Sequence, residues 1–238
     1  MKWRSLSESG AYSDGRPLRQ IFAERKETIA SYVPADVQAV HARAVEGLKA
    51  QGLAAHVLST FKAGAKAPSF ELPDQNGKPV SSASLLAKGR LVLFFIRGRW
   101  CPFCVGQMEA MNFIAAEVEA AGASMVAVSP QTEKQAFFMR DQHKLGFPIL
   151  VDAQNQLARQ FGLVYRVPEE QQGLYRSTFV NLPFVNGDSS WELPIPAIFV
   201  IEGDGSILFA FADEDYTNRP EPLEILAVVE SGSRFRPE

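Results

Sequence analysis

The stretch that decides the fold is Leu91-Val-Leu-Phe-Phe-Ile96-Arg97-Gly98-Arg99-Trp100-Cys101-Pro102-Phe103-Cys104. Its first six residues are apolar, which predicts a buried strand. Pro102 suits the first turn of a helix, because the N–H that proline lacks would have no partner there. Cys101 and Cys104 are the only two cysteines among the 238 residues. A C-x-x-C pair after a strand and before a helix is typical of a redox-active pair.

The predicted helix gives the two sulfurs different surroundings. Cys101 lies at the helix N-terminus, where unpaired N–H groups and the helix dipole favour an anion, and Arg97 and Arg99 add positive charge. Such surroundings lower a thiol pKa from roughly 8.5 into the range of about 3.5–7.5. Cys104, one helical turn later, is expected to lie deeper and within reach of Cys101. We therefore predict Cys101 as the reactive thiol and Cys104 as its resolving partner.

Other uses of two cysteines are less consistent with the sequence. Two thiols do not make a disulfide-stapled scaffold, and two ligands do not close a tetrahedral zinc site. His41, His56 and His143 are isolated and show no ligand spacing. Two inert buried thiols remain an alternative, since free cysteine is often buried. We expect no metal and no cofactor.

Composition narrows the class of protein. The chain is 46% hydrophobic and 21% charged, which suits one globular domain with an appendage. A net charge of −3 argues against a nucleic-acid-binding surface. No apolar run approaches the ~18 residues that span a membrane, and the polar start has no signal-peptide core. The expected location is the cytoplasm, where a C-x-x-C pair cycles between redox states.

The chain divides into three predicted parts. Residues 1–16 are polar and without periodicity, so we expect a flexible N-terminus. Residues 17–61 form a helical extension, in which apolar residues at helical spacing predict two helices, the second restarting at Pro34 and ending near Gly52. The apolar stripes must be buried either on the following domain or on a second copy, as in a homodimer. Residues 62–238 form the main domain.

The main domain alternates strands with helices. Predicted strands cover 91–96, 125–128 and 148–151, with a hairpin over 198–201 and 207–211. Predicted helices start near Pro102, Thr132, Gln154 and Pro222, and the first of them stops at Gly122. This order indicates an α/β fold, and the closing hairpin makes the central sheet mixed rather than wholly parallel.

Several further segments carry a resemblance to a known family. They are Gly64-Ala-Lys-Ala-Pro68-Ser-Phe70-Glu-Leu72-Pro-Asp74-Gln-Asn-Gly77-Lys-Pro-Val80, Ala127-Val-Ser129, Phe147-Pro148-Ile-Leu-Val-Asp152, Ala158 with Phe161-Gly162, and Phe199-Val-Ile-Glu-Gly-Asp-Gly205. In this order they resemble the alkyl hydroperoxide reductase/thiol-specific antioxidant (AhpC/TSA) family, the peroxiredoxins, over roughly residues 62–230, and in particular the C-x-x-C subgroup. The resemblance implies a thioredoxin-like fold with Cys101 at the place of the peroxidatic cysteine.

The sequence also departs from that family. Peroxiredoxins usually have proline seven residues before the reactive cysteine and a hydroxyl residue three before it, where this chain has Phe94 and Gly98. The place of a second peroxide-activating arginine is taken by Ile195-Pro196-Ala197. This segment resembles the cis-proline turn that faces the C-x-x-C pair of thioredoxins, and Trp100 before the first cysteine also resembles thioredoxin.

Three further features of the chain have their own interpretations. The segment 164–194 is rich in aromatic residues and loop signals, and we expect a packed cover on the sheet edge, with a substrate pocket or dimer surface as the alternative. Asp213-Glu214-Asp215 predicts a solvated acidic turn rather than a metal site. Arg219 lies where peroxiredoxins often have a structural arginine.

The resemblance implies a thioredoxin-dependent peroxidase that reduces hydrogen peroxide or organic hydroperoxides. Cys101 would be oxidised to a sulfenic acid, Cys104 would form a disulfide with it, and a thioredoxin- or glutaredoxin-type protein would reduce that disulfide. Arg97 or Arg99 would stabilise the leaving oxygen. Two alternatives remain: a thiol–disulfide oxidoreductase with little peroxidase activity, favoured by Trp100 and Pro196, and a redox-sensing interaction module.

Overall fold

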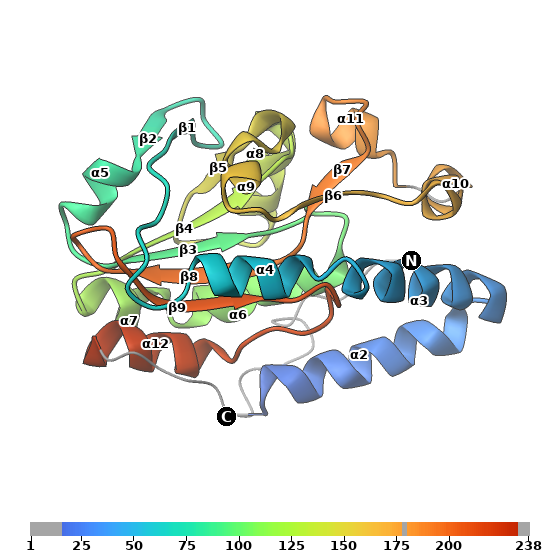
Figure 1. Cartoon of the computed structure of the whole chain (residues 1–238), viewed down its shortest axis with the longest axis horizontal. Coiled ribbons are helices and arrows are strands. Elements are labelled where there is room, and N and C mark those ends of the chain that lie inside the picture. The colour runs from blue at the N-terminus through green and yellow to red at the C-terminus, as the bar shows by residue number, and fades with distance from the viewer. Residues whose placement is uncertain (1–15, 178–179, 233–238) are drawn as a thin grey trace.

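The centre of the molecule is a five-stranded mixed sheet in a computed structural model that describes residues 16–177 and 180–232. The strands are β3 (Leu91–Phe95), β4 (Ser124–Ser129), β5 (Ile149–Val151), β8 (Ala197–Ile201) and β9 (Ile207–Ala212), in the spatial order β5-β4-β3-β8-β9. The pairs β3–β4 and β4–β5 are parallel, whereas β8 is antiparallel to both β3 and β9 (Figure 1). The predicted mixed α/β sheet is confirmed.

Strand β3 lies in the middle of the sheet because both of its faces are apolar. Its alternate side chains enter two separate cores. Val92 and Phe94 face the core that contains residues of α6 (Pro102–Phe113), α8 (Glu133–Gln142) and α12 (Pro222–Ser231). Leu91, Leu93 and Phe95 face the core that contains residues of α4 (Leu53–Thr60) and α9 (Gln156–Gln160). The strand therefore lies between two packed layers, and the start of α6 belongs to the first of them.

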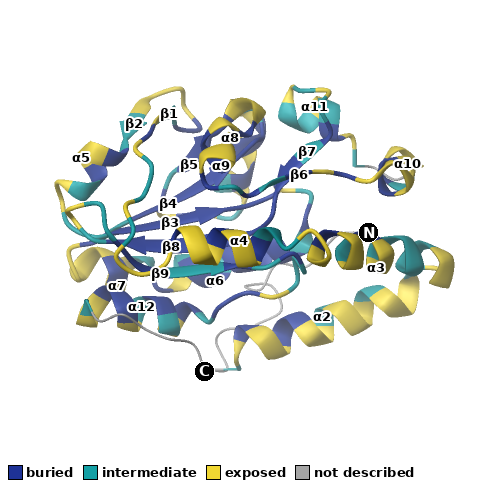
Figure 2. Ribbon diagram, viewed as in Figure 1, coloured by how far each residue is buried: buried dark blue, intermediate teal, exposed yellow. Residues whose placement is uncertain are grey.

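Among the described residues, three helices precede the main domain. They are α2 (Leu18–Tyr32), α3 (Ala35–Lys49) and α4, so the prediction of two helices ending near Gly52 missed the third. Gly52, with φ +66°, turns the chain between α3 and α4 instead of ending the helical segment. Leu18, Ile21 and Phe22 of α2 are buried on the main domain of the same chain, while the outer face of α2 is exposed (Figure 2).

The remaining elements refine the prediction. The helix expected to run to Gly122 is interrupted at Ile114, whose backbone is not helical, and continues as α7 (Ala115–Ala120). A hairpin of β1 (Glu71–Pro73) and β2 (Pro79–Ser81) is followed by α5 (Ser82–Leu86). A 3-10 turn, η1 (Ala153–Asn155), precedes α9.

The 164–194 segment contains regular secondary structure, although its sequence is rich in loop signals. It contains the paired strands β6 (Val164–Arg166) and β7 (Glu192–Pro194) with α10 (Glu169–Ser177) and α11 (Leu182–Asn186) between them. Phe179, one of the aromatic residues noted in this segment, and residues 1–15 of the predicted flexible start lie outside the described residues.

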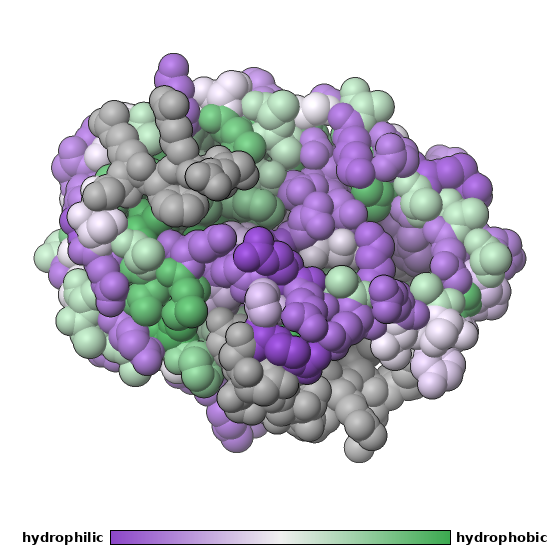
Figure 3. Space-filling model, turned by 90° about the horizontal axis from the view of Figure 1, so that it is seen from below, coloured by the Kyte–Doolittle hydropathy of each residue, from purple (hydrophilic) through white to green (hydrophobic). Residues whose placement is uncertain are grey.

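The outer surface is largely polar where α2 and its neighbours meet solvent. Seen from below, hydrophilic groups cover the middle of the molecule (Figure 3). No helix within residues 16–177 and 180–232 combines the length and hydropathy that a membrane span needs.

Candidate active site

Cys101 lies where β3 has ended and α6 begins. It is the N-cap of α6, its carbonyl accepts the hydrogen bond of Val105 N, and Pro102 occupies the first helical turn. Both cysteines are reduced, and their side chains are 1% exposed at Cys101 and fully buried at Cys104. The first sulfur thus lies at the positive end of a twelve-residue helix.

Arg97 is the buried cation beside Cys101. Its Nη1 is 4.0 Å from the Cys101 Sγ, and its Nη2 donates a hydrogen bond to the Tyr175 hydroxyl at 2.8 Å. The guanidinium also lies over two aromatic rings, 4.1 Å from the centre of Tyr216 and 4.7 Å from that of Trp100. These contacts fix the charge next to the sulfur.

Arg219 plays a comparable part at Cys104, which its sequence position alone did not indicate. Its Nη2 is 3.9 Å from the Cys104 Sγ, and its Nε donates to the Gln107 side chain at 2.9 Å. Arg219 is 115 residues from Cys104 in the sequence, so only the fold brings them together. No local pattern would have revealed this contact.

The two thiols have opposite pKa shifts. Burial raises the pKa of Cys101, but a hydrogen bond from the Cys104 thiol and the positive charges of Arg97 and Arg219 outweigh it and lower the pKa to about 5. Burial and the neighbouring Cys101 thiolate raise the pKa of Cys104 well above its usual value. Near neutral pH the site therefore holds one thiolate and one thiol.

Arg99 does not share the position of Arg97. It is exposed, its backbone N–H donates to Gln131 at 2.8 Å, and its Nη1 donates to Gln135 at 3.1 Å. Of the two arginines proposed from sequence, the structure brings only Arg97 to the thiol.

The indole of Trp100 fills the space beside Gly98. A Cβ at Gly98, whose φ is +141°, would lie 2.8 Å from the Trp100 Nε1. A hydroxyl side chain of the kind usual in peroxiredoxins therefore has no room at this position. Among the described residues, the buried Nε1 of Trp100 and the buried Nε of Arg97 have no hydrogen-bond partner. Two donors near Cys101 are thus left for an acceptor.

Pro196 is buried at the start of β8 but has a different geometry from the one its sequence suggested. No peptide bond within the described ranges is cis, so the likeness to the cis-proline turn of thioredoxins does not extend to the bond before Pro196. The Pro196 carbonyl accepts a hydrogen bond from Asp213 N. Pro196 is also not among the residues that line the cavity beside Cys101.

That cavity, here called the thiol cavity, has a volume of ≈ 970 Å³. It is bounded by α2 and α3 on one side and by α10 and the β9–α12 loop (residues 213–221) on the other, with Cys101 among its lining residues. The lining side chains are mainly apolar: Ile29, Ala30, Val33, Ala35, Val37, Ala39, Ala42, Val45, Trp100, Phe103, Leu174 and Val180. The helical extension thus forms one wall of the space above the thiol.

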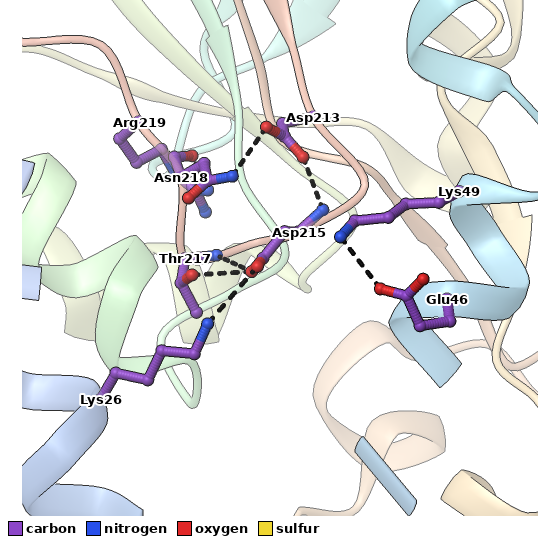
Figure 4. A network of polar contacts seen from close by, with 8 residues as sticks. All are labelled: Lys26, Glu46, Lys49, Asp213, Asp215, Thr217, Asn218 and Arg219. Atoms are coloured by element: carbon purple, nitrogen blue, oxygen red, sulfur yellow. Dashed lines mark hydrogen bonds and ion pairs between the residues drawn. The ribbon is translucent and has the colours of Figure 1, made fainter. Parts of the chain in front are cut away.

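The β9–α12 loop attaches the extension to the main domain. Glu214 is buried and accepts a hydrogen bond from Ala54 N at the start of α4, and Asp215 pairs with Lys26 of α2 at 3.5 Å (Figure 4). The expectation of a solvated acidic turn is therefore wrong for Glu214. Within the described ranges, no group of three or more His, Cys, Asp or Glu could hold a metal ion.

The same loop ends at Glu221, whose side chain contacts the N-termini of two helices, α2 and α12. Its carboxylate accepts the N–H groups of Leu18 at 2.7 Å and Arg19 at 3.0 Å, at the start of α2. It is also the N-cap of α12, in a capping box with Glu224.

Comparison with known proteins agrees with this geometry. The model of the AhpC/TSA family matches residues 63–210, more than half of the chain. The chain belongs to the AhpC/TSA family. A putative peroxiredoxin of Mycobacterium tuberculosis is 32% identical over 120 residues, which are 50% of this chain and 78% of that protein. Peroxiredoxin Bcp of Escherichia coli is 27% identical over 106 residues, 44% of this chain and 67% of that one.

Solved structures give the same assignment. Peroxidoxin BcpB of M. tuberculosis superposes with a TM-score of 0.56 at 27% identity, covering 72% of this chain and 97% of that one. The bacterioferritin comigratory protein of Xanthomonas campestris shares the fold, with a TM-score of 0.53 at 16% identity and coverage of 73% and 94%. This AhpC/TSA chain is a peroxiredoxin-like oxidoreductase with a thioredoxin-like fold. Helices α2–α4 and the β9–α12 loop lie outside residues 63–210, the part of the chain that the AhpC/TSA family model matches.

Proposed function

We propose that this AhpC/TSA protein is a thiol-dependent peroxidase in which Cys101 reacts with the hydroperoxide and Cys104 resolves the product. The observation that carries the proposal is the state of Cys101, a thiol at a helix N-terminus beside a large cavity with its pKa lowered to about 5. The thiolate is the nucleophilic form, and it predominates at neutral pH.

In the first step the Cys101 thiolate attacks the terminal oxygen of the hydroperoxide. An S–O bond forms, the O–O bond breaks, and the remaining oxygen leaves as alkoxide or hydroxide and takes up a proton. Cys101 becomes a sulfenic acid and the peroxide is reduced to an alcohol or water. The unpartnered N–H groups of Arg97 and Trp100 are suited to hold the peroxide oxygens, in place of the hydroxyl that Gly98 lacks.

In the second step Cys104 attacks the Cys101 sulfur, an S–S bond forms, and water leaves. Oxidation of Cys101 to a sulfenic acid removes a negative charge that raises the pKa of Cys104. Arg219, 3.9 Å from Cys104, then favours the Cys104 thiolate. The resolving thiol is therefore activated only after the first step has occurred.

A dithiol protein of thioredoxin or glutaredoxin type completes the cycle. One of its thiolates forms a mixed disulfide with the pair, and its second thiol releases the reduced enzyme, so two electrons return to Cys101 and Cys104.

Stopped-flow oxidation of the reduced protein tests this assignment. With hydrogen peroxide, we expect fast oxidation in the wild type, none in Cys101→Ser, and a trappable sulfenic acid in Cys104→Ser. The assignment fails if Cys101→Ser is oxidised as fast as the wild type, or if Cys104→Ser accumulates no sulfenic acid.

A thiol–disulfide oxidoreductase is the second candidate, and two features favour it. Both sulfurs lie within the first turn of α6, as a dithiol exchange site requires, and Gly98 provides no peroxide-binding hydroxyl. This candidate replaces the first if peroxide reacts no faster than with a free thiol of the same pKa while disulfide substrates turn over.

A further inference from the structure

Arg97 is a cation buried beside Cys101. It is 1% exposed, and within residues 16–177 and 180–232 no aspartate or glutamate forms an ion pair with it. A buried charge is costly unless other groups compensate for it. The groups that surround the guanidinium therefore decide where it lies and which way its N–H groups point.

Three tyrosines surround the Arg97 guanidinium. Tyr165 comes from β6, Tyr175 from α10 and Tyr216 from the β9–α12 loop. They are three of the five tyrosines in the chain. Burial disfavours the charge of Arg97, but interaction with the three hydroxyls and with the nearby thiol keeps its pKa well above the usual value. Distant parts of the sequence thus meet at this one side chain.

Tyr175 is the tyrosine that gives the guanidinium a direction. Arg97 Nη2 donates a hydrogen bond to the Tyr175 hydroxyl at 2.8 Å, while Nη1 lies 4.0 Å from the Cys101 Sγ. Because the guanidinium is planar and rigid, fixing Nη2 also fixes Nη1. Tyr216 and Trp100 contact it through their ring faces, at 4.1 and 4.7 Å. A ring face attracts the cation without fixing the directions of its N–H groups.

Tyr175 is itself held by neighbouring elements. It is 5% exposed, and its ring centre lies 5.4 Å from that of Trp100 and 6.1 Å from that of His41 on α3. Gln171 lies one helical turn earlier on α10, and its Nε2 is hydrogen-bonded to the His41 Nδ1 at 3.0 Å. Residues four apart share one face of a helix. That face of α10 therefore fixes the Tyr175 hydroxyl relative to the start of α6.

We propose that Tyr175 is a positioning residue whose hydroxyl holds the Arg97 guanidinium against the Cys101 sulfur. The inference rests on the proposed function, in which the Cys101 thiolate attacks the hydroperoxide. Tyr175 acts on the thiolate through Arg97. The segment 164–194, which supplies Tyr175, therefore sets the charge beside the thiol as well as covering an edge of the sheet.

The other titratable groups near Cys101 and Arg97 stay in place when Tyr175 alone is changed. They are Cys104, Arg219, Arg25, His41, Tyr165 and Tyr216. Burial and Arg97 lower the pKa of His41, and burial raises that of the two tyrosines, so these three are neutral near pH 7. Two ion pairs also line the thiol cavity, Lys26 with Asp215 at 3.5 Å and Lys49 with Glu46 at 3.0 Å (Figure 4).

A matched pair of substitutions tests the proposal. Tyr175→Phe removes the hydroxyl and keeps the ring that packs on Trp100. Tyr32→Phe makes the same change at a residue that is 69% exposed and does not line the thiol cavity. The pKa of Cys101 is measured from thiolate absorbance between about pH 4 and 8, after thermal denaturation has shown that both variants fold.

The expected result is a rise of about 1 unit in the pKa of Cys101 in Tyr175→Phe, and no change in Tyr32→Phe. An opposite charge within about 4–6 Å lowers the pKa of an acidic group by about 1–3 units. Without the Tyr175 hydroxyl, Nη2 turns toward Tyr165, the second acceptor near the guanidinium, and the charge moves away from the sulfur. An unchanged or lowered pKa in Tyr175→Phe, or an equal rise in Tyr32→Phe, would overturn the proposal.

A double-mutant cycle separates positioning from a general structural effect. In Arg97→Met the buried charge is absent, so adding Tyr175→Phe should leave the pKa of Cys101 unchanged. The same rise with and without Arg97 would show that Tyr175 acts by another route and would overturn the proposal. Arg97→Gln takes the place of Arg97→Met if that variant does not fold.

The titration contains no peroxide, so its outcome is independent of the peroxidase assignment. A raised Cys101 pKa in Tyr175→Phe supports the positioning role even if the wild type does not reduce peroxide, which would refute the proposed function alone. An unchanged pKa refutes the positioning role even if the wild type reduces peroxide rapidly.

Discussion

The hydrogen bond from Cys104 to Cys101 offers a direct measure of how this site produces a thiolate. Cys104→Ala removes the donor, whereas Cys104→Ser replaces the S–H with an O–H donor. Each variant keeps Cys101 as its only thiol. Thiolate absorbance in the ultraviolet therefore reports the ionisation of Cys101 alone.

The size of the effect follows from the nature of the bond. A hydrogen bond to a charged group contributes about 1.5–3 kcal/mol, which corresponds to roughly one to two pKa units. From a starting pKa of about 5, Cys104→Ala should raise the pKa of Cys101 to between roughly 6 and 7. At pH 6 the thiolate fraction would fall from about 90% to about 10–50%.

Cys104→Ser is the matched control. In this variant the pKa of Cys101 should stay closer to its wild-type value. Arg97 and Arg219 are present in both variants, so a difference between them isolates the donor. Identical titration curves for the alanine and serine variants would refute the role of this hydrogen bond. A pKa near 8.5 in both would show that the arginine charges also contribute little.

Three further results are expected. The rate of oxidation by hydrogen peroxide should be constant above pH 6 and fall to half near pH 5. Because the pKa of Cys101 is lowered to about 5, the thiolate predominates at higher pH and is protonated only as the pH falls through 5. Gly98→Thr should lower the free energy of unfolding by about 1–3 kcal/mol and the Tm by roughly 2–12 °C, because φ is +141° and the added Cβ meets the Trp100 indole. Glu214→Ala should cost about 1–3 kcal/mol in urea denaturation, because it leaves the buried Ala54 N–H without its acceptor.

Each of these results has a control variant or an outcome that would contradict it. A rate that still rises between pH 7 and 9 contradicts the lowered thiol pKa. Gly205→Ala also has a positive φ, +84°, but open space around its Cβ, so it should destabilise less than Gly98→Thr. Glu119→Ala removes an exposed carboxylate and should change stability by less than about 0.5 kcal/mol. Equal effects in the Glu214 and Glu119 variants would show that the hydrogen bond from Ala54 N to Glu214 does not stabilise the fold.

The parts of the fold that depend on local pattern were predictable from sequence. The apolar run of β3 and the proline after Cys101 indicate a strand followed by a helix, and the structure has both. Helix α4 was also readable, since Ala54, Val57 and Phe61 recur three and four residues apart. Gly52 was interpreted as a stop, whereas a left-handed glycine can also connect two consecutive helices.

The site itself depends on contacts that no local pattern contains. Arg97 and Arg99 are equally suited to the thiol by sequence, and the turn at Gly98 decides that only Arg97 is buried beside it. Tyr175 reaches Arg97 across 78 residues. Such pairs are fixed by the packing of α10 and the β9–α12 loop around the start of α6, and only the folded chain shows that packing.

The double role of Glu221 has a consequence for the order in which the chain becomes fixed during synthesis. The first residues of α2 are bound by a carboxylate 203 residues further along the chain. At 5–20 residues per second, a ribosome needs roughly 10–40 s to make that interval. The helix that is made early therefore waits for the start of α12 before its N-terminus can be capped, and the wall of the thiol cavity is completed only after Glu221 has been made.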